Sequence, residues 1–364
     1  MKRTDILPAW GRVLRGDLPF LSIEITKECP LRCPGCYANQ PGHSGSGVSQ
    51  QEMRDLQGRQ LIDGVLALVR RLRPLHVSIV GGEPLVRYRE LDVILPELAR
   101  MKLEVQLVTS AVRPIPARWS KLPNLHLVVS IDGLPPEHDR RRSPATYERI
   151  LRHVAGHRFV VHCTVIRQFL SRSDYLHDFA GFWSERREVQ KIWFSLFTPQ
   201  EGPPADERLS PADRVKALEE LAPLPRQFPK VYLPEVVLDG YRHPPLSPKD
   251  CLFAQVTDSI APDLATRIAP CQFGGQPVCS ECGCIAAAGL AAIGKFRLFP
   301  GLRASDVFLL SKKVGEFARR LRRTRSCTTD CDASRNAVTD AACALPPEKR
   351  RAGPFAVRDD HSAL

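Results

Sequence analysis

The sequence has no long apolar run. Nowhere do about 18 or more apolar residues follow one another, which is the length that a membrane-spanning helix requires. The first residues, MKRTDILPAWGRVLRGDLPF, also lack the apolar centre and the small-residue cleavage site of a secretory signal. From these two absences we predict a cytoplasmic protein without a membrane span.

Motifs typical of nucleic-acid binding are also missing. The chain has 52 Lys and Arg residues against 40 Asp and Glu residues, a formal net charge of +12, but the basic residues are spread along it. The densest basic runs, at 139–143 and 318–325, are typical of solvated faces or tails. No aromatic residues are interleaved with basic ones as in the common RNA-binding modules. We therefore do not expect specific nucleic-acid binding.

The sequence has no internal repeat, and strand-like and helix-like segments alternate instead. Strands are expected at 21–26, 76–81, 104–110, 124–132, 158–166 and 191–197, and helices at 50–72, 89–101, 113–121, 145–157 and 174–188. This alternation predicts an α/β fold with a parallel sheet and with functional groups at the carboxyl ends of the strands. A closed barrel needs eight such units, so we expect an open doubly wound sheet or a partial barrel.

The composition changes after residue 198, where the chain becomes rich in proline and then in cysteine. A short helix is possible at 211–222. The predicted parts are an N-terminal segment (1–19), a core domain (20–200), a proline-rich linker (201–250), a small metal-stapled cysteine domain (251–325) and a C-terminal tail (326–364).

Cysteine is the residue type that most constrains the function. The 12 cysteines of a protein in a reducing compartment are not expected to form disulfides, so clustered ones indicate metal or redox chemistry. Cys29, Cys33 and Cys36 follow the first predicted strand in CPLRCPGCYAN, where prolines and a glycine favour a curled loop. A zinc site normally has four ligands, and only His43 is nearby. Three thiolates instead fit a [4Fe–4S] cluster with one open iron.

The spacing of these cysteines resembles the CxxxCxxC signature of the radical S-adenosylmethionine (SAM) enzymes. The resemblance implies a partial (β/α)6 TIM-like barrel, SAM bound at the open iron, and an electron donor such as flavodoxin or ferredoxin. It also implies reductive cleavage of SAM to a 5′-deoxyadenosyl radical that abstracts hydrogen. The family commonly has an aromatic residue before the third cysteine, near the adenine. Here that residue is Gly35, and Tyr37 lies just beyond the motif.

A second motif, VGGEP at 80–84, follows the second predicted strand. It is similar to the glycine-rich turn whose backbone contacts the SAM amino group in this family, although alone it is also typical of an ordinary turn. Strand order in the family adds hydroxyl and carboxylate groups at the ends of the third and fourth strands, Thr109 among them, and an arginine at the end of the fifth. The SAM-binding residues that the resemblance implies are Tyr37, Gly81, Gly82, Glu83, Pro84, Ser110, Ser130, Asp132 and Arg167.

A second cysteine cluster lies in PCQFGGQPVCSECGC. Cys271, Cys279, Cys282 and Cys284 are close enough in sequence to hold one further [4Fe–4S] cluster. The segment resembles the auxiliary-cluster extensions of radical SAM enzymes that are called SPASM and twitch domains. A structural zinc site is the alternative. The sequence leaves Cys251, Cys327, Cys331 and Cys343 unassigned.

We therefore expect a radical SAM enzyme that acts on a peptide, a lipid precursor or a small metabolite, with no residue singled out as catalytic. The alternatives are a non-catalytic iron–sulfur or zinc protein and a radical SAM enzyme that modifies RNA. Cys163 is expected to be a buried apolar residue. His153 and His157 are expected on a solvated helix face, because no third metal ligand accompanies them.

Overall fold

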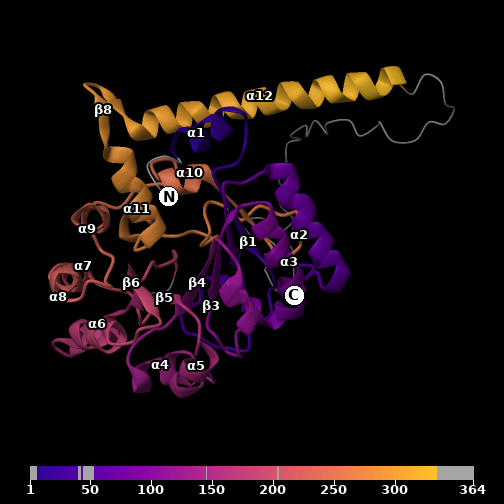
Figure 1. The fold of residues 1–364 in the computed structure, drawn as a ribbon. Helices are drawn as coiled ribbons and strands as arrows, with labels where there is room; N and C mark the ends of the chain where they lie inside the picture. Colours follow the sequence, from indigo (N-terminus) through magenta and orange to yellow (C-terminus); the bar gives the residue numbers. More distant parts are fainter. Residues whose placement is uncertain (1–5, 40–41, 44–52, 145, 203–204, 334–364) are drawn as a thin grey trace, which may run out of the picture. The chain divides into compact units, whose positions relative to one another are not determined.

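The structure is a computed structural model that describes residues 6–39, 42–43, 53–144, 146–202 and 205–333. Its main feature is a seven-stranded sheet in which every pair of neighbouring strands is parallel (Figure 1). The order is β6-β5-β4-β3-β2-β1-β7, so the sheet is open, with β6 and β7 at its edges. The strands are β1 (Phe20–Glu24), β2 (His76–Val80), β3 (Glu104–Thr109), β4 (Leu125–Ser130), β5 (Phe159–Val165), β6 (Val189–Leu196) and β7 (Thr257–Ile260).

The expected α/β fold with a partial-barrel sheet is confirmed, and all six predicted strands are present. The seventh strand was not predicted, because TDSI is short, has only one apolar residue and lies among the C-terminal cysteines. It pairs with β1, Leu21 opposite Asp258 and Ile23 opposite Ile260. The cysteine-rich region therefore contributes an edge strand to the core sheet.

Helices connect the strands and cover the sheet (Figure 1). Those between β1 and β6 are α2 (Gly58–Leu72), α3 (Tyr88–Arg100), α4 (Pro135–Arg141), α5 (Tyr147–His153) and α6 (Tyr175–Ser184), and α1 (Ile6–Leu14) precedes β1. The expected helix at 50–72 starts only at Gly58. The expected helix at 113–121 is a 3-10 segment, Ala117–Lys121, because Pro114 and Pro116 disrupt a regular α-helix. The unpredicted α4 starts with two prolines, which fit the first turn of a helix.

The segment expected as a linker, 201–250, is folded. It contains α7 (Pro211–Leu221), α8 (Leu224–Gln227) and α9 (Glu235–Arg242). Tyr241 of α9 is buried, and its hydroxyl donates a hydrogen bond of 2.6 Å to the carbonyl of Phe194 in β6. Proline here starts helices rather than loosening the chain, since α7, α8 and α9 each have a proline at or before their first turn.

The remaining elements are α10 (Leu252–Val256), α11 (Ile285–Lys295), the antiparallel pair β8 (Arg297–Phe299) and β9 (Leu302–Arg303), and α12 (Ala304–Ala333). Residues 1–319 form one compact unit, and a second unit starts at residue 320, within α12. The expected tail beyond residue 333, with Cys343, lies outside the described residues.

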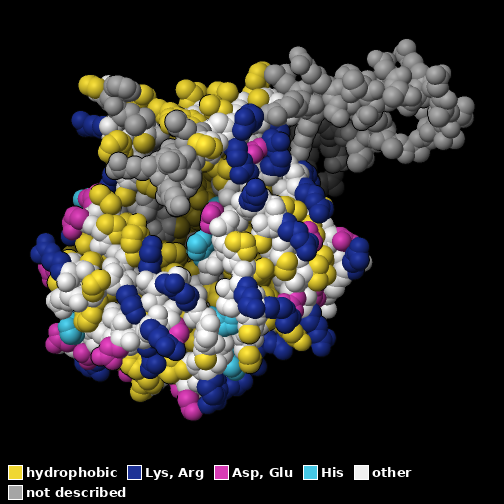
Figure 2. Space-filling view, viewed as in Figure 1, with side chains coloured by type: hydrophobic (Ala, Val, Ile, Leu, Met, Phe, Trp, Pro, Cys, Tyr) yellow, Lys and Arg dark blue, Asp and Glu magenta, His cyan; other side chains and the backbone are white. Residues whose placement is uncertain are grey.

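The core lies between the sheet and its helices and is lined by strand residues such as Ile23, Ile79, Leu107 and Val129. Cys163 of β5 is fully buried there, as predicted. On the face shown in Figure 2, Lys and Arg side chains lie among acidic and apolar ones. Within the described part of the chain, no helix combines the length and apolar character needed to cross a membrane.

Candidate functional site

The three N-terminal cysteines lie on the loop that leaves the carboxyl end of β1. All three are partly exposed, and Cys29 and Cys33 also pack against the apolar core. Burial raises the pKa of the Cys29 thiol to about 11 and also raises the pKa of Cys33. These two thiols are therefore protonated at neutral pH unless a cation binds them, and an iron–sulfur cluster would supply that cation.

The donor set of this loop fits a cluster better than a single ion. Among the described residues, no group of three Cys, His, Asp or Glu side chains converges closely enough to hold one metal ion. A [4Fe–4S] cluster does not require such convergence, because each thiolate binds a different iron. Three thiols on one loop thus match three irons and leave the fourth for a small molecule.

The GGEP turn packs directly on the start of the cysteine loop. The amide of Gly82 donates to the carbonyl of Thr26 (2.7 Å), and the amide of Glu83 donates to the carbonyl of Glu28 (2.8 Å). A Cβ atom at Gly82 would lie 2.3 Å from that Glu28 oxygen, so only glycine permits this approach. The fold therefore brings the two predicted motifs into backbone contact.

The side chain of Glu83 is buried and turned into the protein. It accepts hydrogen bonds from the amides of Leu85 (2.9 Å) and Ser110 (2.7 Å) and from the Thr109 hydroxyl. Burial raises the pKa of Glu83. Its carboxyl group thus fixes the GGEP turn to the end of β3, while Pro84 starts the 3-10 segment Pro84–Arg87.

A buried network of charges lies at the ends of β3 and β4. The guanidinium of Arg142 donates to Asp132 (2.7 Å) and to the Ser110 hydroxyl (2.8 Å). Arg141 also contacts Asp132, and it forms two hydrogen bonds of 2.7 and 2.8 Å with Glu207. Burial alone would raise the pKa of Asp132, but the charges of Arg142 and Arg141 outweigh burial and hold it far below its usual range.

The basic run at 139–143 was predicted to be a solvated face, and this is wrong for two of its members. The side chains of Arg141 and Arg142 are only 11% and 13% exposed, because the carboxylates of Asp132, after β4, and Glu207, after β6, face the end of α4. Both arginines also act electrostatically on Cys33 and lower its pKa against the larger effect of burial. The sequence analysis missed Arg141, Arg142 and Glu207, whose partners are distant in the chain.

The other predicted SAM-binding residues lie in two kinds of environment, the charge network and the protein surface. Ser110 and Asp132 belong to the charge network, and Ser130 lies at the end of β4 beside it. The side chain of Arg167 is exposed, and only its backbone amide contacts the network region, at the carbonyl of Glu207 (3.2 Å).

Tyr37 points toward the second cysteine region. Its ring lies 5.2 Å from the ring of Phe273 and 5.5 Å from that of His43, measured between centroids. A different aromatic residue approaches the motif position before Cys36. A Cβ atom at Gly35 would lie 2.8 Å from Cε2 of Phe197, which follows β6, and 2.8 Å from Oε2 of Glu207. The Phe197 ring therefore occupies the space next to Gly35.

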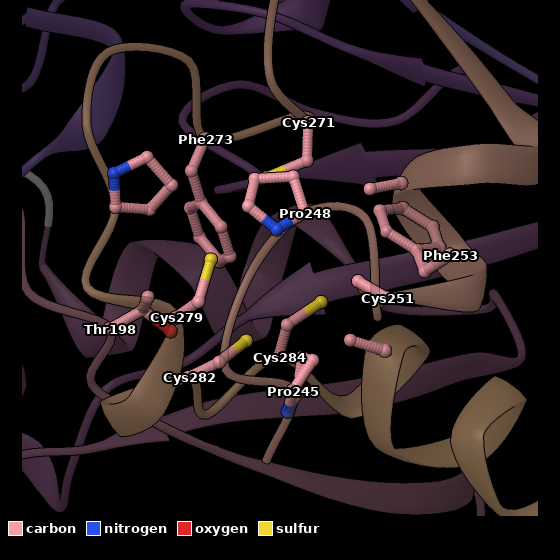
Figure 3. A pocket seen from close by; sticks show the side chains of 13 residues that line it. Thr198, Pro245, Pro248, Cys251, Phe253, Cys271, Phe273, Cys279, Cys282 and Cys284 are labelled. Carbon is pink, nitrogen blue, oxygen red and sulfur yellow. The ribbon is translucent and has the colours of Figure 1, made fainter.

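Five cysteines line a second cavity, shown in Figure 3. They are the four predicted ones, Cys271, Cys279, Cys282 and Cys284, together with Cys251. Burial raises the pKa of all five, to about 12 for Cys271. The rest of the lining is mostly apolar and includes Phe253 and Phe273. The thiols thus share a mainly dry space, which suits an iron–sulfur cluster.

Polar groups around this cavity face sulfur and loop carbonyls. The side-chain amide of Gln272 donates to Sγ of Cys284 (3.3 Å). The guanidinium of Arg214 donates to the backbone carbonyls of Glu281 and Cys282 (2.9 and 3.3 Å). Such donors stabilise the negative charge of thiolates and of a cluster.

His43 joins the two cysteine regions. Its Nε2 lies 2.7 Å from a carboxylate oxygen of Glu24, and its Nδ1 lies 2.9 Å from the carbonyl of Phe273. Burial lowers the pKa of His43, but the hydrogen bond and charge of Glu24 and the hydrogen bond to the Phe273 carbonyl together outweigh burial, so the net shift of the pKa is upward. The two ring nitrogens of His43 thus link Glu24 of β1 to the loop that contains Cys271 and Phe273.

His153 and His157 do not lie on a solvated helix face, contrary to the prediction. His157 is 3% exposed and hydrogen-bonds the carbonyl of Ile115 (3.1 Å), while His153 bonds the carbonyl of Ala111 (2.7 Å). Two carbonyls from the segment after β3 draw these rings inward.

Three comparisons relate the chain to known proteins. Residues 23–157 match the family described as the Radical SAM superfamily. The 7-carboxy-7-deazaguanine synthase of Hyperthermus butylicus is 32% identical over 107 residues, which are 29% of this chain and 41% of that protein. The match thus spans less than half of that relative's length.

Solved structures share the fold. Streptococcus suis SuiB, bound to precursor peptide SuiA, has a TM-score of 0.52 at 14% identity, over 84% of this chain and 68% of SuiB. Native anSMEcpe with bound AdoMet has a TM-score of 0.52 at 15% identity, over 70% of this chain and 74% of that protein. The family match extends from β1 to the end of α5 and includes the cysteine loop, the GGEP turn and the charge network up to Arg142. Residues 23–157 are therefore similar to a radical SAM domain.

Proposed function

We propose that this protein is an enzyme that cleaves SAM reductively and abstracts a hydrogen atom from an organic substrate. The observation that supports it most is the backbone contact between the GGEP turn and the start of the three-cysteine loop. A [4Fe–4S] cluster bound by Cys29, Cys33 and Cys36 would supply the open iron and the electron for this cleavage.

The chain's own residues would bind and orient SAM. The backbone of Gly81–Glu83 would face the methionine amino group, with Glu83 itself positioning the turn from beneath. Arg142, held by Asp132 and Ser110, is a buried cation that acts on Cys33, and it would attract the SAM carboxylate. Ser130 and Asp132 would lie beside Arg142 at the carboxyl end of β4. Arg167 is exposed and is the weakest member of the predicted set.

Phe197 is the better candidate for the adenine contact. Its ring fills the space beside Gly35, where the family commonly has an aromatic side chain, whereas the Tyr37 ring packs on His43 and Phe273. We expect Phe197→Ala to raise the Kd for SAM about tenfold, since one lost aromatic contact is worth roughly 1–1.5 kcal/mol. Tyr37→Leu, which removes the aromatic ring but keeps an apolar side chain, should leave the Kd nearly unchanged. Equilibrium dialysis with the reconstituted protein measures the Kd of each variant for SAM. A larger increase in Kd for the Tyr37 variant than for the Phe197 variant would assign the adenine contact to Tyr37.

The second cavity would hold an auxiliary [4Fe–4S] cluster. Four of its five cysteines are sufficient, and Cys251 is a ligand candidate equal to the four that the sequence predicted. The likeness to a SPASM or twitch extension stays part of this proposal. A peptide is the substrate class to test first, because SuiB, which shares the fold, binds a precursor peptide.

The first test concerns the radical chemistry. Anaerobically reconstituted protein should form 5′-deoxyadenosine from SAM when reduced by dithionite, and SAM should change the EPR signal of the reduced cluster. The triple variant Cys29→Ala/Cys33→Ala/Cys36→Ala should lose both properties. Cys163→Ala, which removes a buried thiol outside both groups, is the matched control. If the triple variant still forms 5′-deoxyadenosine, the cluster assignment is wrong.

The second test concerns the auxiliary cluster and the non-catalytic alternatives. The same triple variant should retain about four irons and four sulfides per chain, as one [4Fe–4S] cluster requires. Additional alanines at Cys271, Cys282 and Cys284 should remove them. Zinc in place of iron would identify a structural zinc site and leave the radical domain unaffected.

A further inference from the structure

A separate cavity adjoins the three-cysteine loop. Its walls come from three segments that are distant in sequence: the loop itself, the chain after β3, and the start of α5. The lining includes Pro30, Leu31, Ala111, Val112, Arg149 and His153. Pro30 and Leu31 directly follow Cys29, so the cavity lies next to one of the proposed cluster ligands.

Three arginines lie in, or directly next to, the segments that line this cavity. Arg149 lines it, and Arg32 and Arg113 each follow a lining residue. The side chains of Arg32 and Arg149 are exposed, and neither forms an ion pair with any residue in the described part of the chain. Arg113 lies over the ring of Tyr88, 3.8 Å from its centroid, and has no carboxylate partner among the described residues either. The arginine rim, which we define as these three residues, thus has no carboxylate partner in the described part of the chain.

The proposed function requires an electron from outside the chain for each reduction of the cluster. An electron carrier must approach the cluster closely, and the cavity beside Pro30 is a concave surface next to Cys29. A carrier with an acidic face would be attracted by the three arginines and guided to this position. Electron-transfer complexes are small and transient, so a patch of this extent is sufficient.

We propose that the rim of Arg32, Arg113 and Arg149 is the docking surface for an acidic one-electron carrier protein of the flavodoxin type. This inference rests on the proposed radical SAM function. In the step, the carrier is oxidised by one electron and the cluster bound by Cys29, Cys33 and Cys36 is reduced by one. No covalent bond forms or breaks, and no proton is transferred.

The test uses charge reversal and two reductants. The variants are Arg149→Glu and Arg32→Glu/Arg149→Glu, and the control is Arg187→Glu, which reverses a residue that is 94% exposed just before β6. The probe is a flavodoxin of net negative charge. Its Kd is measured by titration calorimetry, and cluster reduction is followed by stopped-flow absorbance with either reduced flavodoxin or dithionite.

We expect the double variant to weaken flavodoxin binding about tenfold or more and to slow reduction by flavodoxin in proportion, and Arg149→Glu to have a smaller effect in the same direction. Iron content, reduction by dithionite and the Arg187→Glu control should not change. Wild-type binding should weaken as salt is added, and less so for the double variant.

Equal flavodoxin binding and reduction rates in the wild type and the double variant would overturn the proposal. So would a parallel loss of reduction by dithionite, because the arginines would then act on the cluster itself. A wild-type protein without a reducible cluster would refute the proposed function instead, and the flavodoxin titration would still decide whether this rim is a docking surface.

Discussion

Asp132 shows how one residue depends on charges that are remote in sequence. Its carboxylate is buried and accepts from Arg141, Arg142 and the amide of Thr164 (3.0 Å). A buried carboxylate is stable only when such partners compensate for lost hydration. The position of Asp132 at a strand end was predictable, but its arginine partners were not, because the run at 139–143 has the composition of a solvated surface.

We expect Asp132→Asn to lower the free energy of unfolding of the apoprotein by about 3–5 kcal/mol at pH 7, since it leaves two guanidinium groups without their shared carboxylate. The folded-state pKa of Asp132 is depressed, so its contribution is complete above the unfolded pKa of about 3.9 and is lost as pH falls through the folded value. Wild type and variant should therefore differ equally at pH 7 and pH 5 and converge below about pH 4. Urea unfolding at each pH measures this. A difference that already shrinks between pH 7 and pH 5 would show that another group titrates.

The cysteine loop and the GGEP turn were predictable for a different reason. Both motifs are defined by local spacing, and the alternating strands placed both at the same edge of the sheet. Tyr37 and Phe197 mark the limit of such reasoning. Which ring lies beside Gly35 depends on contacts between segments about 160 residues apart in the sequence.

Among the elements, β6 and the loop at Cys282–Cys284 form the closest link between the sheet and the second cavity. The amide of Leu196 donates to the carbonyl of Gly283 (2.9 Å), and the amide of Gly283 donates to the Thr198 hydroxyl (2.9 Å). A Cβ atom at Gly283 would lie 2.0 Å from the Leu196 carbonyl oxygen. The second cavity is therefore attached to the strand that directly precedes Phe197, whose ring lies beside Gly35 of the three-cysteine loop.

Gly283→Ala should lower the free energy of unfolding by about 1–3 kcal/mol and reduce the iron content of the second site, because backbone must shift to admit the methyl group. Gly289→Ala is the matched control in α11, where a Cβ atom meets nothing within 4 Å. It should be neutral or stabilise the protein by about 0.4–1 kcal/mol. Thermal unfolding and iron analysis of both variants compare the two positions. Equal effects would mean that the contact at Leu196 does not position the cysteine loop.

The edge strand β7 and the helices at 211–242 were outside the reach of the sequence patterns. A strand of four residues gives little periodicity, and prolines at helix starts resemble those of linkers. Both become clear only through their packing partners, β1 for the strand and β6 for α9. Elements built on local periodicity were predicted, and elements stabilised by long-range contacts were not.

At the scale of the whole molecule, the formal charge of +12 overstates the cations available to a polyanion. Arg141 and Arg142 are buried against Asp132, and Arg87, whose side chain is 7% exposed, pairs with Glu28 and Asp55. Others, such as Arg118 with Asp92, are in surface ion pairs. The exposed Arg32 and Arg149 near the cysteine loop are the ones that we propose contact a small protein, and two such residues do not make an extended track for a nucleic acid backbone.

We therefore expect RNA to bind weakly and without sequence preference, with affinity that falls steeply between about 50 and 200 mM salt as counterions screen the phosphates. Fluorescence anisotropy with several unrelated RNAs at each salt concentration measures this. Arg32→Glu/Arg149→Glu should change the RNA affinity only slightly, because non-specific binding draws on many scattered cations, while it strongly weakens flavodoxin binding. Submicromolar binding of one particular RNA at about 150 mM salt would contradict this expectation. It would place an RNA substrate ahead of a peptide for the same radical chemistry, since specific recognition then adds to what charge alone provides.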